Sequence, residues 1–227
     1  GTYNEKKDSI KVWENSIFIQ QDSSDTINMF EDQFIRYQDS LKEIIICYNK
    51  VVINGNLIDG DCDSIYYNKK DSTLKCIKDP IIWLDENQVT GEKIEFKISE
   101  GEIYNMYVTN NSMIITRKDS IHYDQIKGDE INGHFKNNVL NILDVKKNGK
   151  AIYYTKDEKD SLINEINIIS CESMKIHIKE NKIEKIKFKT KPNGKTLPLD
   201  KAKKDFYLDD FKIISKRSYQ EKKGVAK

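Results

Sequence analysis

The feature that most constrains the fold of this chain is a pattern of apolar residues that occurs three times. Each copy has a short run of alternating apolar and polar residues, a polar turn and a second such run. The first copy begins at Ile94 and the second begins 37 residues later, at Ile131. The third begins 80 residues after the first, at Met174. The apolar positions are Ile94, Phe96, Ile98, Ile103, Met106 and Val108 in the first copy, Ile131, Phe135, Leu140, Leu143 and Val145 in the second, and Met174, Ile176, Ile178, Ile183, Ile186 and Phe188 in the third.

Each copy predicts a β-hairpin. Ile94, Phe96 and Ile98 are two residues apart, so on a strand they share one face, while Glu95 and Lys97 lie on the other. The turns contain residues that favour reversals, in the ranges 99–101, 136–138 and 179–181. Gly133 interrupts the second copy and predicts a bulge or a close approach of two backbones. Stacked hairpins predict a rolled or solenoid-like all-β architecture.

Two smaller elements repeat with the hairpins. Gln88-Val89-Thr90-Gly91 returns as Gln125-Ile126-Lys127-Gly128, again 37 residues later. Asp63-Ser64-Ile65-Tyr66-Tyr67 is echoed by Asp119-Ser120-Ile121-His122-Tyr123. The repeated unit is therefore longer than a single hairpin.

The chain contains only three prolines and no linker rich in Pro, Gly or Ser, which favours one continuous domain. We place this β domain at 8–195, because the repeat stops after Pro192-Asn193-Gly194. Residues 196–227 form an expected C-terminal extension, partly irregular, in which 200–210 could form a short helix. The basic tail that follows, 216–227, is expected to be mobile.

The composition disfavours nucleic acid and anionic membranes as general partners. Thirty-eight Lys and Arg residues balance 37 Asp and Glu residues, so no strong overall field attracts nucleic acid or an anionic membrane. No apolar run approaches the roughly 18–20 residues that a membrane-spanning helix needs. The chain begins with Gly-Thr-Tyr rather than with a signal peptide, and we expect that a targeting segment preceded it.

The cysteines and histidines do not form a recognisable metal or cofactor motif. Cys47, Cys62, Cys76 and Cys171 have no CxxC spacing, so we expect neither a metal nor a cofactor. Their disulfide pairing is open in an oxidising compartment. Cys47 and Cys76 lie in apolar stretches and are interpreted as buried small hydrophobic residues.

Four segments, in this order, resemble the OstA-like family related to LptA, LptC and the periplasmic part of LptD. They are Ile53-Asn54-Gly55-Asn56, Asp63 to Tyr67, Asp79-Pro80-Ile81-Ile82-Trp83 and Gln88 to Ile94, and the match extends from about Asp8 to Phe211. The resemblance implies a β-jellyroll, or β-taco, whose V-shaped sheets enclose an apolar groove for lipid acyl chains. It also implies a non-enzymatic periplasmic carrier that moves lipopolysaccharide toward the outer membrane of a Gram-negative cell.

The resemblance also implies binding residues and partners. Strand periodicity by itself indicates only a buried face, but in this family that face would be a lipid groove. The implied partners are lipid A acyl chains and other jellyroll domains of a transport bridge, including further copies of this chain, joined at their strand edges. The implied groove residues are Ile94, Phe96, Ile98, Met106, Val108, Phe135, Leu143, Ile176, Ile178 and Ile186.

The third copy carries lysines between its apolar residues, at 182, 185, 187, 189 and 191. We interpret them as a solvated outer face. The alternative is a basic rim that meets the phosphates of lipid A.

Two other classes of function compete with the carrier. His122, His134 and His177 stand alone, and the chain has no GxSxG, HExxH or P-loop motif. A β-helix enzyme that degrades polysaccharide could still hide two carboxylates on separate strands. A structural β-repeat scaffold would show the same apolar pattern. Lipid binding distinguishes these three hypotheses.

Overall fold

The computed structural model describes residues 1–21, 26–38, 43–156, 162–180, 182–201 and 206–216. In these residues fifteen strands form one antiparallel sheet, and the sequence-based prediction of an all-β fold is confirmed. Within the described ranges no helix is long and apolar enough to cross a membrane. The elements are β1 (Thr2–Asn4), η1 (Glu5–Lys7), β2 (Ser9–Gln21), β3 (Thr26–Gln38), β4 (Glu43–Asn54), β5 (Asp59–Asn68), β6 (Thr73–Ile77), β7 (Ile81–Leu84), β8 (Asn87–Thr90), β9 (Lys93–Ser99), β10 (Glu102–Arg117), β11 (Tyr123–Lys136), β12 (Val139–Lys156), β13 (Ile163–Lys179), β14 (Lys182–Lys189), β15 (Asn193–Pro198) and η2 (Leu199–Lys201).

The three predicted hairpins are present. They are formed by β9 with β10, β11 with β12 and β13 with β14. Glu100 and Gly101 turn the first hairpin with positive φ angles of 53° and 78°, and Asn137 and Asn138 turn the second with 52° and 62°. Asn and Gly adopt this left-handed region more readily than other residues, which explains the turns at these points.

The long strands bend in the middle. β10 shifts its pairing with β11 between Thr109 and Ser112, where Asn110 and Asn111 have positive φ. β12 does the same beside β13, at Lys147 and Asn148. An extra residue of this kind bends a strand and increases its local twist. Each long strand is therefore divided into two halves.

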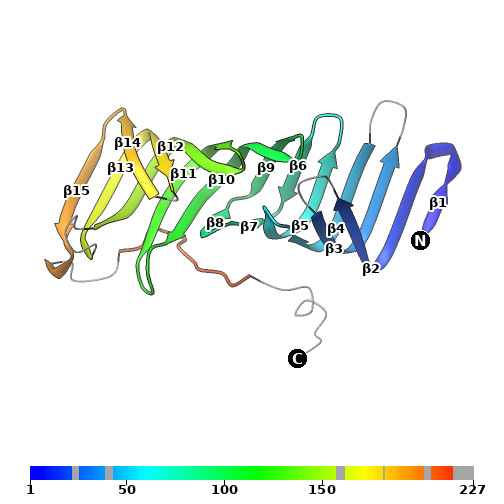
Figure 1. Cartoon of the computed structure of the whole chain (residues 1–227), viewed down its shortest axis with the longest axis horizontal. Helices are drawn as coiled ribbons and strands as arrows, with labels where there is room; N and C mark the ends of the chain where they lie inside the picture. The colour runs from blue at the N-terminus through cyan, green and yellow to red at the C-terminus, as the bar shows by residue number, and fades with distance from the viewer. Residues whose placement is uncertain (22–25, 39–42, 157–161, 181, 202–205, 217–227) are drawn as a thin grey trace.

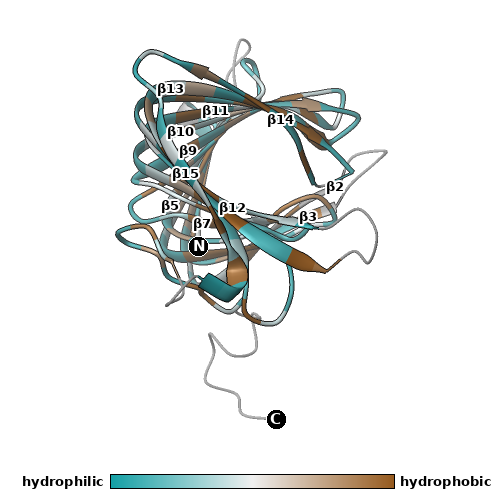
Figure 2. Ribbon diagram, turned by 90° about the vertical axis from the view of Figure 1, so that its left-hand side faces the viewer, coloured by the Kyte–Doolittle hydropathy of each residue, from teal (hydrophilic) through white to brown (hydrophobic). Residues whose placement is uncertain are grey.

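The bends divide the sheet into two arms. β5 pairs with β6 through Ser64–Asn68, but with β7 through Asp59–Asp61. We call the part that contains β6, β9 and β14 arm A, and the part that contains β7, β8 and β15 arm B. The arms share β2 to β5 and β10 to β13, and together they curl around the long axis of the molecule (Figure 2).

The inner faces of both arms form the main core. The alternation predicted for the first hairpin is confirmed, because Ile94 and Phe96 are completely buried whereas Glu95 forms ion pairs on the other face with Lys75, Lys93 and Lys97. All four cysteines are buried and unpaired, as expected for Cys47 and Cys76. Burial raises the pKa of the Cys47 thiol well above its usual value, so this thiol is protonated at neutral pH.

The repeated glycines lie where two strands approach closely. A Cβ atom on Gly91 would be 2.6 Å from Cγ1 of Val108, and one on Gly128 would be 2.6 Å from Cγ1 of Val145. At Gly133 the close neighbours are side chains rather than the second backbone that was predicted, because a Cβ atom there would lie 3.1 Å from Cδ1 of Leu140. These approaches explain why the repeat contains Gly.

The repeated glutamines hold the C-terminal segment 206–216, which we call the strap. Gln125 donates from Nε2 to the Phe206 carbonyl at 3.0 Å and accepts from the Leu208 N–H at 2.8 Å. Gln88 makes the same pair of bonds to the Lys212 carbonyl and the Ile214 N–H, both at 2.8 Å. The strap runs from the β15 end of the molecule back along arm B toward its centre (Figure 1).

The strap covers the outer face of arm B. Val89 and Ile126 belong to the inner core, so their neighbours Gln88 and Gln125 face outward. Phe206 and Leu208 of the strap pack on an outer cluster that contains Ile152, Tyr154 and Ile166. This packing gives arm B a second, smaller core.

The C-terminal region is irregular rather than helical where it is described. Between 200 and 210, the expected helix is limited to η2, and the strap has a turn at Asp209 and Asp210 but no helix. Residues 202–205 and the predicted mobile tail beyond 216 lie outside the described residues. β1 precedes residue 8 and β15 crosses the expected boundary at 195, so the division at 8–195 and 196–227 stays a prediction.

Candidate functional site

A cavity of about 310 Å³ lies between the two arms in the N-terminal half of the roll. β3 and the turn before β5 supply its wall from arm B, and β5, β6 and the β9–β10 hairpin supply its wall from arm A. Lys69, Ser72, Glu100 and Gly101 complete the lining at the hairpin turns of arm A. The apolar lining residues are Ile27, Met29, Leu57, Ile58, Tyr67, Leu74, Ile98 and Ile103.

A second cavity lies between the arms in the C-terminal half of the roll. There the space between the arms falls to about 20 Å³, lined by Ile114 and Ile126 from arm B and by Ile178 and Ile183 from arm A, among others. Side chains from both arms therefore approach one another closely at this point. Of these two cavities, the one in the N-terminal half is much the larger.

The ten predicted groove residues all belong to the interior cluster. Six are almost completely covered by other side chains: Ile94, Phe96, Met106, Val108, Leu143 and Ile176. The other four, Ile98, Phe135, Ile178 and Ile186, are partly buried against that cluster. Of the ten, Ile98 lines the large cavity, while Leu143 and Ile178 line the small one. Lipid contact at these positions stays a prediction.

Most residues of the cavity were missed by the sequence analysis. Ile27, Met29, Leu57 and Ile58 precede the region in which the three copies are recognisable. An available signal was the alternation Ile65, Tyr67 on β5, which mirrors the inward spacing of Ile94 and Phe96. Hairpin periodicity identifies an inner face, but it contains no information about how far apart two such faces lie.

The inward-facing row changes from apolar to charged at the edge of arm A. Phe34 on β3, Ile45 on β4 and Tyr67 on β5 face the core. The next inward-facing positions, two residues away in each case, are Arg36 on β3, Glu43 on β4 and Lys69 just beyond the end of β5. We call these three charged residues the lip. Of the three, Lys69 also lines the cavity, so the lip adjoins the apolar interior through this residue.

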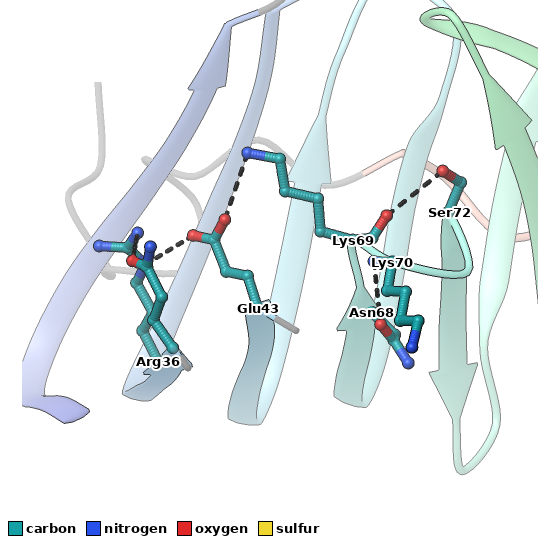
Figure 3. Close-up of polar contacts among 7 residues, drawn as sticks. Arg36, Glu43, Asn68, Lys69, Lys70 and Ser72 are labelled. Atoms are coloured by element: carbon teal, nitrogen blue, oxygen red, sulfur yellow. Dashed lines mark hydrogen bonds and ion pairs between the residues drawn. The ribbon is translucent and has the colours of Figure 1, made fainter. Parts of the chain in front are cut away.

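One carboxylate connects the three lip residues. Arg36 Nε lies 2.6 Å from Glu43 Oε1, and Lys69 Nζ lies 3.2 Å from Glu43 Oε2 (Figure 3). Partial burial raises the pKa of the Glu43 carboxyl, but the hydrogen bonds from Arg36 and Lys69 lower it more. Glu43 is therefore ionised at neutral pH and is shared by two cations.

The turn after β5 fixes the position of Lys69. The Lys69 N–H donates to the Glu43 carbonyl at 3.0 Å, and the Ser72 N–H donates back to the Lys69 carbonyl at 3.2 Å. Asn68 Oδ1 accepts from the Lys70 N–H at 3.1 Å. The side chain of Lys70 extends away from Glu43 (Figure 3). Two adjacent lysines therefore have different surroundings.

The lysines of the third copy are mostly solvated. Lys185, Lys187 and Lys189 are exposed on β14, while Lys182 lines the small cavity. This agrees with our interpretation of an outer face for the first three.

In the described part of the chain, no group of three or more His, Cys, Asp or Glu side chains is placed to hold a metal ion.

Comparisons with known proteins give a likeness of fold. No family model matches the chain, and no curated protein matches it. A solved structure, LptH from Pseudomonas aeruginosa, is described as the LptA-homologous periplasmic component of the conserved lipopolysaccharide transport device. It aligns with a TM-score of 0.47 and 11% identity over 62% of this chain and 93% of that chain. At this level of similarity, no function is transferred to this chain.

Proposed function

We propose that this chain is a periplasmic lipid carrier that holds acyl chains of lipopolysaccharide inside its rolled sheet and passes them toward the outer membrane. The observation that carries the proposal is the cavity of about 310 Å³, which is mostly apolar inside and is bordered by Lys69 of the charged lip. A site of that composition suits a molecule with an acyl chain and a polar head. The resemblance of the ordered segments from Ile53 to Ile94 suggests which amphiphile it is.

The energetics favour a carrier of this kind. Exposing each methylene of an acyl chain to water costs about 0.8 kcal/mol of free energy. Burying a chain of about twelve carbons therefore stabilises it by roughly 10 kcal/mol. Isoleucine, leucine and methionine side chains in the cavity offer that shielding without directional bonds. The chain can therefore enter and leave without breaking a fixed set of hydrogen bonds.

The ends of the sheet suit assembly with similar domains. Among the described strands, β1 pairs only with β2, and β14 pairs only with β13. Such edges offer backbone groups to a strand of another molecule. Head-to-tail pairing would extend the interior from one domain to the next, as a transport bridge requires.

Photo-crosslinking to lipopolysaccharide tests the proposal. A photoreactive amino acid would replace Leu74 or Ile98 in the cavity, Phe96 in the packed interior, or the exposed Lys187 as a control. We expect crosslinks at positions 74 and 98 and none at 187. Crosslinks at 96 as well would show that lipid displaces the packed side chains next to the cavity, because Phe96 is directly opposite Leu74.

A failure to crosslink at 74 and 98 would contradict the carrier. That result would favour a structural β-repeat scaffold, whose interior only supports the fold. Thermal unfolding of each substituted protein would show that it retains its fold, so that a missing crosslink has a single meaning.

A further inference from the structure

We propose that the lip formed by Arg36, Glu43 and Lys69 binds the oxyanion head, phosphate or carboxylate, of an amphiphile that places a single acyl chain in the adjacent cavity. This inference rests on the proposed function, because it assigns the chemical class of the ligand to the same site. Nothing in the repeat pattern pointed to these three residues, which precede its first copy.

The placement of the charges on the strands is the first argument. Arg36 is directly opposite Ile45 in the β3–β4 pairing, and Ile45 is directly opposite Tyr67 in the β4–β5 pairing. Residues directly opposite one another share a face, so Arg36 lies in the same inward row as the apolar lining. Glu43 and Lys69 form the next inward-facing row toward the edge of arm A. Of the three, Lys69 also lines the cavity, Glu43 pairs with Lys69, and Arg36 pairs with Glu43. A chain in the cavity would therefore place its head beside Lys69, at the inner end of the lip.

The balance of charge is the second argument. Arg36 and Lys69 share the single carboxylate of Glu43, which leaves one positive charge uncompensated within this group. Glu100 is the acidic residue that lines the cavity, but it lies on the β9–β10 turn, with β6 between it and β5. Two strand spacings amount to about 10 Å, close to the screening length at physiological salt. The three lip residues thus carry a net positive charge of their own.

The exposure of the three side chains is the third argument. Lys69 is 64% exposed and Arg36 is 33% exposed, whereas Glu43 is only 17% exposed. An arriving anion meets the two cations before it meets the carboxylate. Lys and Arg are the residues that commonly bind phosphate and carboxylate groups through charge-assisted hydrogen bonds.

The size of the cavity limits the tail. At about 310 Å³ it lies near the lower end of the range of roughly 300–1,000 Å³ for small-molecule sites. That volume suits one acyl chain rather than the several chains of a lipid A. A ligand with several chains would bind here through one of them, unless the arms separate.

Calorimetry with three probes of equal chain length tests the inference: dodecyl phosphate, dodecanoate and the neutral monolauroylglycerol, each below its micelle concentration. We expect both anions to bind about tenfold more tightly than the neutral probe, as expected for one charge-assisted contact. Inorganic phosphate at the same concentration should not compete, because it lacks the tail.

Three variants locate the effect. Lys69→Gln should remove most of the preference for the anions and leave the neutral probe unchanged. Lys70→Gln is the matched control, because the adjacent side chain extends away from Glu43, and it should leave all three affinities unchanged. Glu43→Gln should increase the affinity for the anions several-fold, since it frees two cations. A purely structural Glu43 would give no such gain.

The possible failures are distinguishable. Equal affinity of the wild type for all three probes, or equal losses in Lys69→Gln and Lys70→Gln, would overturn the lip site while leaving the carrier intact. No binding of any probe would overturn the proposed function itself. Competition by inorganic phosphate would indicate a site for free anions instead. If Glu43→Gln does not fold, the comparison of the two lysine variants still decides.

Discussion

At the scale of single residues, Glu43 couples stability to pH at the mouth of the cavity. Its pKa is below the ordinary value of 4.5, because hydrogen bonds from Arg36 and Lys69 outweigh the effect of burial. A carboxyl with a lowered folded-state pKa contributes stability above its unfolded pKa and loses it as the pH falls through the folded value. The contribution of Glu43 should therefore be complete at neutral pH and absent in strong acid.

We predict that the difference in unfolding free energy between wild type and Glu43→Gln is largest above about pH 5 and shrinks as the pH falls below 4.5. Urea unfolding at a series of pH values measures this difference. Asp63→Asn serves as a comparison at a second carboxylate away from the lip. Asp63 also has a lowered pKa, but the hydrogen bonds that lower it come from Ser64 and Lys78. A difference that stays constant with pH would show that the ion pairs of Glu43 add no stability.

The close approach at Gly91 gives a second prediction at this scale. Gly91→Ala would place a methyl group 2.6 Å from Cγ1 of Val108, so the backbone or the valine must shift. We expect a loss of about 1–3 kcal/mol in unfolding free energy, the usual cost of overpacking. Adding Val108→Ala should restore part of that loss, so the two changes should be strongly non-additive in a denaturation cycle. Additive losses would place the strain elsewhere.

At the scale of elements, the strap depends on two glutamines that are 37 positions apart in the repeat, Gln88 and Gln125. Each side-chain amide satisfies one backbone N–H and one carbonyl of the strap, as a neighbouring strand would do. The Lys127 amine adds a bond of 2.9 Å to the Asp209 carbonyl. An irregular segment is thereby held on a sheet without forming a strand of its own.

We predict that Gln88→Ala loosens the strap around Lys212 and Ile214, because it leaves both backbone groups without their partner. The cost should be about 1–3 kcal/mol for buried groups, and less if water replaces the amide. Hydrogen exchange of the Ile214 amide should accelerate, and limited proteolysis should cut within 206–216. Gln33→Ala, at an exposed glutamine of β3, is the control. Unchanged exchange in Gln88→Ala would mean that packing alone holds the strap.

The sequence predicted the hairpins well but not their surroundings. Ile94, Phe96 and Ile98 alternate with charged residues, and this local pattern is sufficient to define a strand and its inner face. Gln88 and Gln125 were recognised as repeated, yet a glutamine does not reveal a partner that lies more than 80 residues away. The helix expected in 200–210 was largely wrong where the chain is described, because the backbone of the strap bonds to these side chains instead.

At the scale of the whole molecule, the interior changes along the long axis. Ile98 and Ile178 occupy equivalent positions in the first and third copies of the repeat, 80 residues apart. Yet Ile98 lines a space of about 310 Å³ and Ile178 one of about 20 Å³. The same residue in the same local pattern thus lies beside a wide cavity at one end and a narrow one at the other.

This contrast gives a prediction that compares the same substitution at both positions. Ile98→Trp can place its larger side chain in the cavity, so it should cost little stability while abolishing the binding of a twelve-carbon probe. Ile178→Trp has no such space and should lower the unfolding free energy by about 1–3 kcal/mol. If it still folds, it should bind the probe normally. Denaturation and calorimetry on both variants measure the two effects.

The opposite result would place the ligand elsewhere. If Ile178→Trp abolished binding and Ile98→Trp did not, the acyl chain would enter the narrow cavity, and the arms would have to separate by the volume of that chain. If neither variant changed binding, the probe would bind outside the roll. Only the first pattern, with binding lost at 98 and stability lost at 178, agrees with a wide cavity beside Ile98 and a narrow one beside Ile178.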